Sequence, residues 1–232
     1  MSLIRQTFED KKELDQALAN RVAQALAEAI DQRGWAVLVV SGGRTPQGFF
    51  QALRQQDLDW SRVTVTLADE RWVPADHADS NERLVREHLL QDRAAAAGFV
   101  SLYAPGLSAK EGQTEIEARL TRLPDPLDVV ILGMGDDGHT ASLFPQAPEL
   151  ADALQTTAHC IAMTPVTAPH MRMSLSLKTL AKAHNLIVHI TGDGKCSLLQ
   201  AQMTAALPRQ DWLPIRTVLD SALNSPVVFW SK

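Results

Sequence analysis

The residues best suited to chemistry lie between positions 128 and 145, in the stretch DVVILGMGDDGHTASLFP. His139 is the candidate base, because imidazole is the side chain that most readily exchanges a proton near neutral pH. Asp137 precedes it by two residues and can orient the ring. Glycines at 133, 135 and 138 surround the pair, directly after an apolar run of strand length. The pattern predicts an acid/base residue held in a tight turn at the end of a strand.

Two other interpretations of this stretch fit it less well. The three glycines match the dinucleotide-binding pattern, which requires a long helix immediately afterwards. Pro145 and Pro148 interrupt such a helix within about two turns. A calcium loop lacks its bidentate glutamate here, and His139 with Asp136 and Asp137 offers too few ligands for a metal cage. We therefore expect no metal and no organic cofactor.

A second glycine-rich turn, SGGRTP at 41–46, follows the apolar run 35–40. Gly42 and Gly43 expose backbone N–H groups in front of a helix, where a phosphate can bind. Arg44 adds a positive charge, and Thr45 is expected to cap the helix with Pro46 in its first turn. The alternative is an ordinary strand-to-helix turn.

Three further sets of charged residues lie close to predicted strands. Asp69, Glu70 and Arg71 follow the strand predicted at 63–68, where they form either part of a site or a solvated ion pair. Arg172 alternates with apolar neighbours, so its side chain is expected to project from one face of a strand. There it is either a site residue or the partner of a surface carboxylate. Lys195 ends the turn TGDGK, which is not a Walker A loop because a glycine and the Ser/Thr are missing.

Apolar strands that alternate with amphipathic helices must position these residues. We predict a helix over 14–30 that stops at Gly34, and buried strands at 35–40, 63–68, 129–132, 186–190 and 227–230. This alternation predicts an α/β fold with a mainly parallel sheet covered on both faces, as a single domain over 1–232. Ligands bind at the carboxyl ends of the strands of such a sheet, which would bring the turns together.

The chain resembles the glucosamine-6-phosphate isomerase/6-phosphogluconolactonase family, and in particular the 6-phosphogluconolactonases. The resemblance rests on motifs that occur in order along nearly the whole chain: SGGRTP, DERWVP, SN at 80–81, GMGDDGHTASLFP, HMRMSLS, TGDGK and LPIRTVL. It implies a modified Rossmann-like, three-layer fold. It also implies hydrolysis of 6-phospho-D-glucono-1,5-lactone to 6-phospho-D-gluconate, the second step of the oxidative pentose phosphate pathway. Arg44 departs from the family pattern, in which a serine is expected.

For this reaction we assign His139 as the general base on water and Asp137 as its orienting partner. Arg71, or the backbone N–H groups near Gly42 and Gly43, would stabilise the oxyanion. The phosphate candidates are Arg44, Arg172 and Lys195, with Thr45 in the same turn. Asp69 and Glu70 are orienting residues, and which carboxylate faces the sugar stays open.

Two other functions compete with this assignment. A glucosamine-6-phosphate deaminase/isomerase of the same fold would continue towards Asn-Glu-Pro after the histidine, and the segment 142–145 lacks that glutamate. A non-catalytic sugar-phosphate sensor would need a helix-turn-helix module, for which no segment has room.

The amino-acid composition limits the classes of binding partner. The net charge of -5 and the pI of about 5.8 argue against nucleic acid and anionic membranes. The first twelve residues given contain no apolar run of signal-peptide length, and no run is long enough to suggest a membrane span. The two cysteines fit no metal-ligand spacing or redox pair, so we expect a reducing compartment. We expect a cytoplasmic monomer or weak homodimer whose partner is the small phosphorylated sugar lactone.

Overall fold

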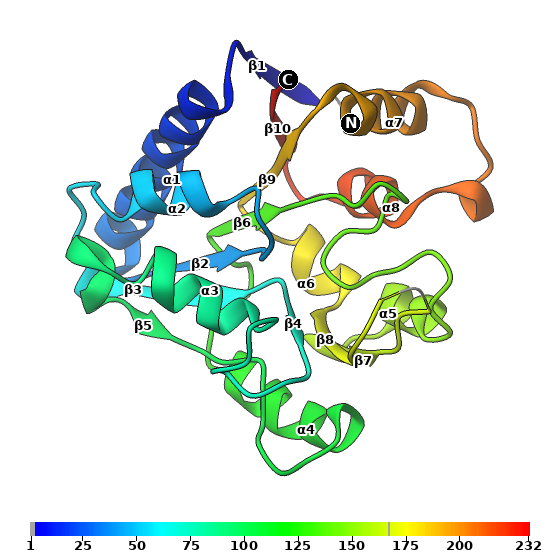
Figure 1. The fold of residues 1–232 in the computed structure, drawn as a ribbon, viewed down its shortest axis with the longest axis horizontal. Coiled ribbons are helices and arrows are strands. Elements are labelled where there is room, and N and C mark those ends of the chain that lie inside the picture. The colour runs from blue at the N-terminus through cyan, green and yellow to red at the C-terminus, as the bar shows by residue number, and fades with distance from the viewer. Residues whose placement is uncertain (1–2, 167) are drawn as a thin grey trace.

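A seven-stranded sheet runs through the centre of the computed structural model, which describes residues 3–166 and 168–232 (Figure 1). All neighbouring strands in this sheet pair in parallel. Their order is β1 (Ile4–Phe8), β10 (Val227–Ser231), β9 (Asn185–Thr191), β6 (Val129–Leu132), β2 (Ala36–Val40), β3 (Val63–Leu67) and β5 (Gly98–Phe99). The predicted α/β class, with a mainly parallel sheet, is confirmed.

The central strands are buried because helices cover both faces of the sheet. Every residue of β2 and β6 is buried, as continuous apolar runs of a doubly covered sheet require. Helices α1 and α2 pack together beside the sheet, and α8 contacts both α6 and α7 (Figure 1). The helices are α1 (Lys11–Arg33), α2 (Gln47–Leu53), α3 (Asn81–His88), α4 (Ala109–Leu120), α5 (Leu150–Gln155), α6 (Leu177–Ala181), α7 (Asp193–Thr204) and α8 (Pro214–Asp220).

The helix ends show which local signals were interpreted correctly. Helix α1 ends at Gly34, whose φ of 84° is left-handed and whose N–H donates to the carbonyl of Ile30. Ser80, one of the two residues of the SN motif at 80–81, caps α3 by accepting the N–H of Arg83. Thr45 does not cap α2: the N-cap position is taken by Pro46, and no side chain there accepts a hydrogen bond. The prediction that Thr45 caps this helix was therefore wrong.

A second, antiparallel sheet was not anticipated from the sequence. It consists of β4 (Asp69–Arg71), β8 (Arg172–Leu175) and β7 (Cys160–Met163), in that order. Ala68 is the point of transfer, because its N–H donates to Val40 of the parallel sheet while its carbonyl accepts from Leu175 of the small one. The segment 69–71 is therefore a strand of the small sheet and not a loop after β3.

The edge strand β1 was also not predicted from the sequence. Its residues, IRQTF, are mostly exposed and carry no alternation of apolar and polar side chains. The strand forms because the backbone of β10 offers unpaired groups along its free side, in the register Ile4 to Val227. No helix of the described segments is long and apolar enough to cross a membrane.

Candidate active site

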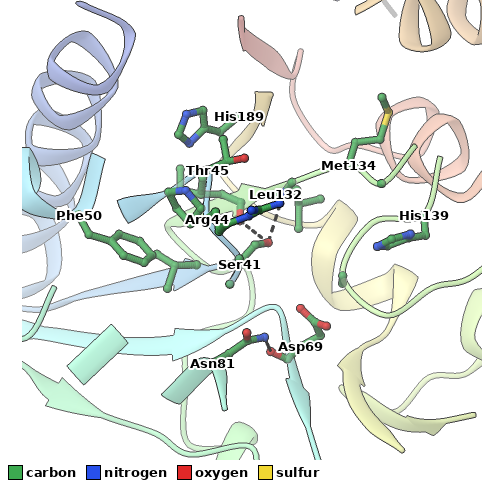
Figure 2. Close-up of a pocket in the computed structure, with 18 of the residues that line it drawn as sticks. Ser41, Arg44, Thr45, Phe50, Asp69, Asn81, Leu132, Met134, His139 and His189 are labelled. Carbon is green, nitrogen blue, oxygen red and sulfur yellow. Dashed lines mark hydrogen bonds between the residues drawn. The ribbon is translucent and has the colours of Figure 1, made fainter. Parts of the chain in front are cut away.

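A cavity of about 340 Å³ opens at the carboxyl ends of the parallel strands (Figure 2). The turn after β2 forms one wall, the turn after β6 forms another, and β4 with the start of α3 forms a third. The polar residues that line it are Ser41, Gly42, Gly43, Arg44, Thr45, Asp69, Arg71, Asn81, Gly133, Gly135, His139, His189 and Lys195. The fold thus gathers turns that lie up to about 150 residues apart at the edge of the sheet where α/β proteins bind ligands.

His139 and Asp137 form a hydrogen-bonded pair. Nδ1 of His139 lies 2.6 Å from Oδ1 of Asp137, which also accepts the backbone N–H of His139. Partial burial acts to raise the pKa of Asp137, but the backbone N–H and the imidazole of His139 outweigh it, so that the pKa lies below its ordinary value. Since an ionised carboxylate only accepts hydrogen bonds, Nδ1 carries the proton and Nε2 keeps a free lone pair. His139 lines the cavity and Asp137 does not.

The glycine turn shapes the site because two of its positions admit no side chain. A Cβ on Gly135 would lie 2.2 Å from both Cε1 and Nδ1 of His139. Gly138 has a φ of 77°, and a Cβ there would lie 2.5 Å from Leu213. The ring of His139 packs against Phe144, with a centroid separation of 4.6 Å. The backbone therefore approaches the imidazole closely, and the ring is held from two sides.

Two hydroxyl groups tie the walls of the cavity together. Ser41 donates to the carbonyl of Ile131 and accepts the N–H of Gly133, which joins the turns after β2 and β6. Ser142 donates to Oδ2 of Asp69 at 2.6 Å. Asp69 thereby faces the cavity opposite the β2 turn (Figure 2).

Glu70 has a different place, although it is adjacent to Asp69. Successive residues of a strand point to opposite sides, and Glu70 is buried against the start of α3. Its carboxylate accepts the backbone N–H groups of Arg71, Asn81 and Glu82 and the hydroxyl of Ser80. Burial raises the pKa of Glu70 to about 7, against the opposing effect of these four donors. Glu70 does not line the cavity, and its carboxylate anchors a helix.

We expect Glu70→Gln to destabilise the fold at pH 8, where the native carboxylate is ionised. The glutamine NH₂ would face the N–H and O–H donors that the carboxylate of Glu70 accepts. Each buried donor left without an acceptor should lower the free energy of unfolding by roughly 1–3 kcal/mol. Glu111→Gln is a matched control, because Glu111 also binds the start of a helix through Ser108 but is exposed to water. Urea unfolding should show a clearly smaller loss for the control; equal losses would contradict the anchoring role.

Three cationic side chains line the cavity: Arg44, Arg71 and Lys195. Arg71 donates through Nη1 to the carbonyl of Asp79 at 2.6 Å. Nζ of Lys195 lies 3.9 Å from Asp136, which is almost completely exposed. The cavity is therefore rich in positive charge although the chain as a whole is acidic.

The predicted convergence of Arg172 on this cavity is not seen. Arg172 begins an antiparallel strand, where it pairs with Arg71 and not with a carboxyl end of the parallel sheet. Its side chain is buried, its Nε and Nη1 have no partner among the described residues, and burial lowers its pKa. Arg172 thus lies on the strand beside β4 and outside the lining of the cavity.

Comparison with known proteins assigns the family. The model of the glucosamine-6-phosphate isomerases/6-phosphogluconolactonase family matches residues 9–230. The chain belongs to this family. A 6-phosphogluconolactonase of Pseudomonas aeruginosa is 46% identical over 221 residues, which cover 94% of this chain and 92% of the relative. One of Rhizobium meliloti is 43% identical over 233 residues and covers both chains completely.

Solved structures of the family agree with the fold described above. The crystal structure of a 6-phosphogluconolactonase from Shewanella baltica has a TM-score of 0.95 and 45% identity to this chain. The match covers 100% of this chain and 98% of the other. The modified Rossmann-like fold that the resemblance implied is thus shown.

Three lining residues with polar side chains were not predicted as site residues from the sequence: Ser41, Asn81 and His189. Asn81 entered the sequence analysis only through the SN motif at 80–81. Its amide donates to the carbonyl of Asp69, and its oxygen leaves no room for a side chain at position 42. Ser41 precedes the glycines and could have been included by its position in the motif. His189 lies within a buried strand, and burial with the charge of Lys11 lowers its pKa to about 3. Nothing in its local sequence marks it.

Proposed function

We propose that this member of the family is a 6-phosphogluconolactonase that hydrolyses 6-phospho-D-glucono-1,5-lactone to 6-phospho-D-gluconate in the oxidative pentose phosphate pathway. The observation that carries the proposal is the His139–Asp137 pair at a cavity lined by three cationic side chains. Relatives of this name, similar over nearly the full length, support it. A phosphorylated lactone needs both features, a base for water and positive charge for the phosphate.

The chemistry begins with water. Nε2 of His139 takes one proton while the water oxygen attacks the lactone carbonyl carbon, which gives a tetrahedral oxyanion. The imidazolium then returns the proton to the ring oxygen as the C–O bond breaks, and the product is an open-chain acid with a free hydroxyl. Asp137 holds the Nδ1 proton and stabilises the transient positive charge on the ring. No residue has to form a covalent intermediate.

Backbone N–H groups are available for the oxyanion or for the phosphate. In the described ranges, the N–H groups of Gly42, Gly43 and Arg44 donate to no backbone or side-chain acceptor. Nη1 of Arg71 donates to the carbonyl of Asp79, and the other N–H groups of the guanidinium remain available as donors. These preorganised donors are the kind of group that stabilises developing negative charge.

Arg44 and Lys195 are the proposed phosphate ligands, because each adds a charge-assisted hydrogen bond from a different wall of the cavity. Asp69, not Glu70, is the proposed acceptor for a sugar hydroxyl. Its Oδ2 is occupied by Ser142, while its Oδ1 accepts no hydrogen bond from the described part of the chain. The orientation of Asp69 towards the cavity supports this choice between the two carboxylates.

We expect Gly135→Ala to lower kcat by roughly 100-fold, because the new Cβ would displace the His139 ring by about 1 Å or more. Gly98→Ala is the control, since its Cβ would meet only ordinary contacts at 3.6 Å and lies on an outer strand. Initial rates at saturating lactone, with circular dichroism to confirm folding, provide the measurement. Near-wild-type turnover by Gly135→Ala would show that the ring position is not critical.

A coupled assay tests the function itself. The lactone is generated in place by glucose-6-phosphate dehydrogenase, and acid release is followed with and without the protein after spontaneous hydrolysis is subtracted. We expect acceleration that is proportional to the protein concentration. Glucosamine 6-phosphate serves as the second substrate, and release of ammonia from it without lactone hydrolysis would favour the deaminase instead.

A further inference from the structure

A cluster of potential metal ligands lies outside the cavity. His77 and Asp79 belong to the turn between β4 and α3, and His170 lies just before β8. One ligand atom from each of the three side chains lies within 4.8 Å of the others. None of the three residues lines the active-site cavity. The cluster therefore joins two segments that are 91 residues apart in sequence.

The spacing of the ligand atoms is close to that of a bound ion. Nε2 of His170 lies 3.0 Å from Oδ2 of Asp79, and Nδ1 of His77 lies 3.8 Å from the same oxygen. In a tetrahedral zinc site with bonds of about 2.0–2.1 Å, neighbouring ligand atoms are roughly 3.3 Å apart. Because the widest separation in the cluster is bounded at 4.8 Å, movements of up to about 1.5 Å would give this geometry. Rotations of exposed side chains can supply them.

The backbone holds the two imidazoles in place before any ion binds. His170 has a φ of 68°, a left-handed conformation that is uncommon for a residue other than glycine and carries an energetic cost. The turn that carries His77 and Asp79 is closed by hydrogen bonds of 2.9 Å from His77 to Pro74 and 3.0 Å from Ser80 to His77. The N–H of Asp79 donates to Nδ1 of His77, so this nitrogen carries no proton. An ion bound at Nδ1 would replace this hydrogen bond.

We propose that His77, Asp79 and His170 bind one divalent transition-metal ion, with zinc as the best fit and water in the remaining position. Two imidazoles and a carboxylate are the ligand types that such ions select. The three side chains are 44%, 52% and 29% exposed, so an ion can enter from solvent. Arg71 and Arg172 oppose a cation electrostatically, which sets the affinity below that of a closed structural site.

The ion would stabilise the position of β4, which forms one side of the active-site cavity, without taking part in hydrolysis. Asp79 accepts Nη1 of the catalytic candidate Arg71 at its carbonyl, and Met171, next to His170, accepts the N–H of Trp72. Both ligand segments are thus attached to β4 and its continuation. Metal binding would join them directly and restrict the position of Arg71.

Equilibrium dialysis of the untagged, chelator-treated protein against zinc tests the proposal. We expect one equivalent of zinc in the wild-type protein and a rise of its melting temperature on zinc addition. His170→Gln and Asp79→Asn should each lower the affinity by more than the roughly 10–100-fold that loss of an outer-shell partner costs. Their melting temperatures without metal show whether they are folded.

Two control variants separate this site from adventitious binding. His184→Gln removes an exposed histidine that is not part of the cluster and should bind zinc as the wild type does. His139→Asn removes a second, partly exposed histidine–carboxylate pair outside the cluster and should also keep the equivalent. Zinc-free wild-type protein should retain lactone turnover. The proposal is overturned if the wild type binds no zinc, or if either cluster variant binds it as tightly as the wild type.

Discussion

Replacing His139 with asparagine is expected to lower kcat by roughly 10²–10⁴-fold, the usual contribution of a positioned general base. Asparagine keeps a hydrogen-bonding group near Asp137 but cannot accept the proton of water. Substrate binding should change far less, because the proposed phosphate ligands Arg44 and Lys195 lie in other walls of the cavity. Steady-state rates on the phosphorylated lactone, corrected for spontaneous hydrolysis, give both constants.

His159→Asn is a matched control for this prediction. Its Nδ1 lies 2.6 Å from Glu117, as that of His139 lies from Asp137, but the pair is located away from the cavity. The control should keep a kcat close to that of the wild type. A His139→Asn enzyme with near-wild-type kcat would mean that another group is the base.

The pH profile of the wild-type enzyme adds an independent check. A protonated imidazole cannot take a proton from water, so kcat should fall as the solution becomes acidic. The pKa of Asp137 is depressed, so its carboxylate stays ionised through the mildly acidic range and does not cause the fall. In His139→Asn this acid limb should disappear. If the same limb persists, it belongs to a different group.

Replacing Lys195 with alanine is expected to lower kcat/KM for the phosphorylated lactone by roughly 10–150-fold. This range corresponds to the loss of one charge-assisted contact of about 1.5–3 kcal/mol. Lys195 is free to make such a contact, because its only carboxylate neighbour within the described segments, Asp136, lies at 3.9 Å and is exposed. Unphosphorylated gluconolactone should be a poor substrate whose kcat/KM hardly changes.

Lys182→Ala is the control, since Lys182 forms an exposed ion pair with Asp125 outside the cavity. Both lactones should be hydrolysed normally by this variant. If Lys195→Ala loses the same factor on both lactones, Lys195 does not recognise the phosphate, and the role has to be reassigned to Arg44 or to the backbone donors after β2.

The sequence by itself determined those features that depend on nearby residues. The buried strands could be predicted because apolar, β-branched runs at 36–40 and 129–132 have no other stable place than a covered sheet. The contact between His139 and Asp137 was also predictable, since two residues separated by one glycine in a tight turn must lie close together. The cap at Ser80 and the stop at Gly34 are local in the same sense.

The tertiary structure alone decided how distant segments meet. Asp69 and Glu70 have the same chemistry, and only the pairing of β4 with β8 turns one to the cavity and the other to α3. Arg172 could not be placed because its alternation with apolar neighbours indicates a strand but not the antiparallel pairing of that strand with β4. His189 reaches the cavity from within a buried strand, and His77 meets His170 only because two loops fold onto β4. Such contacts arise from packing between elements, which local sequence patterns do not encode.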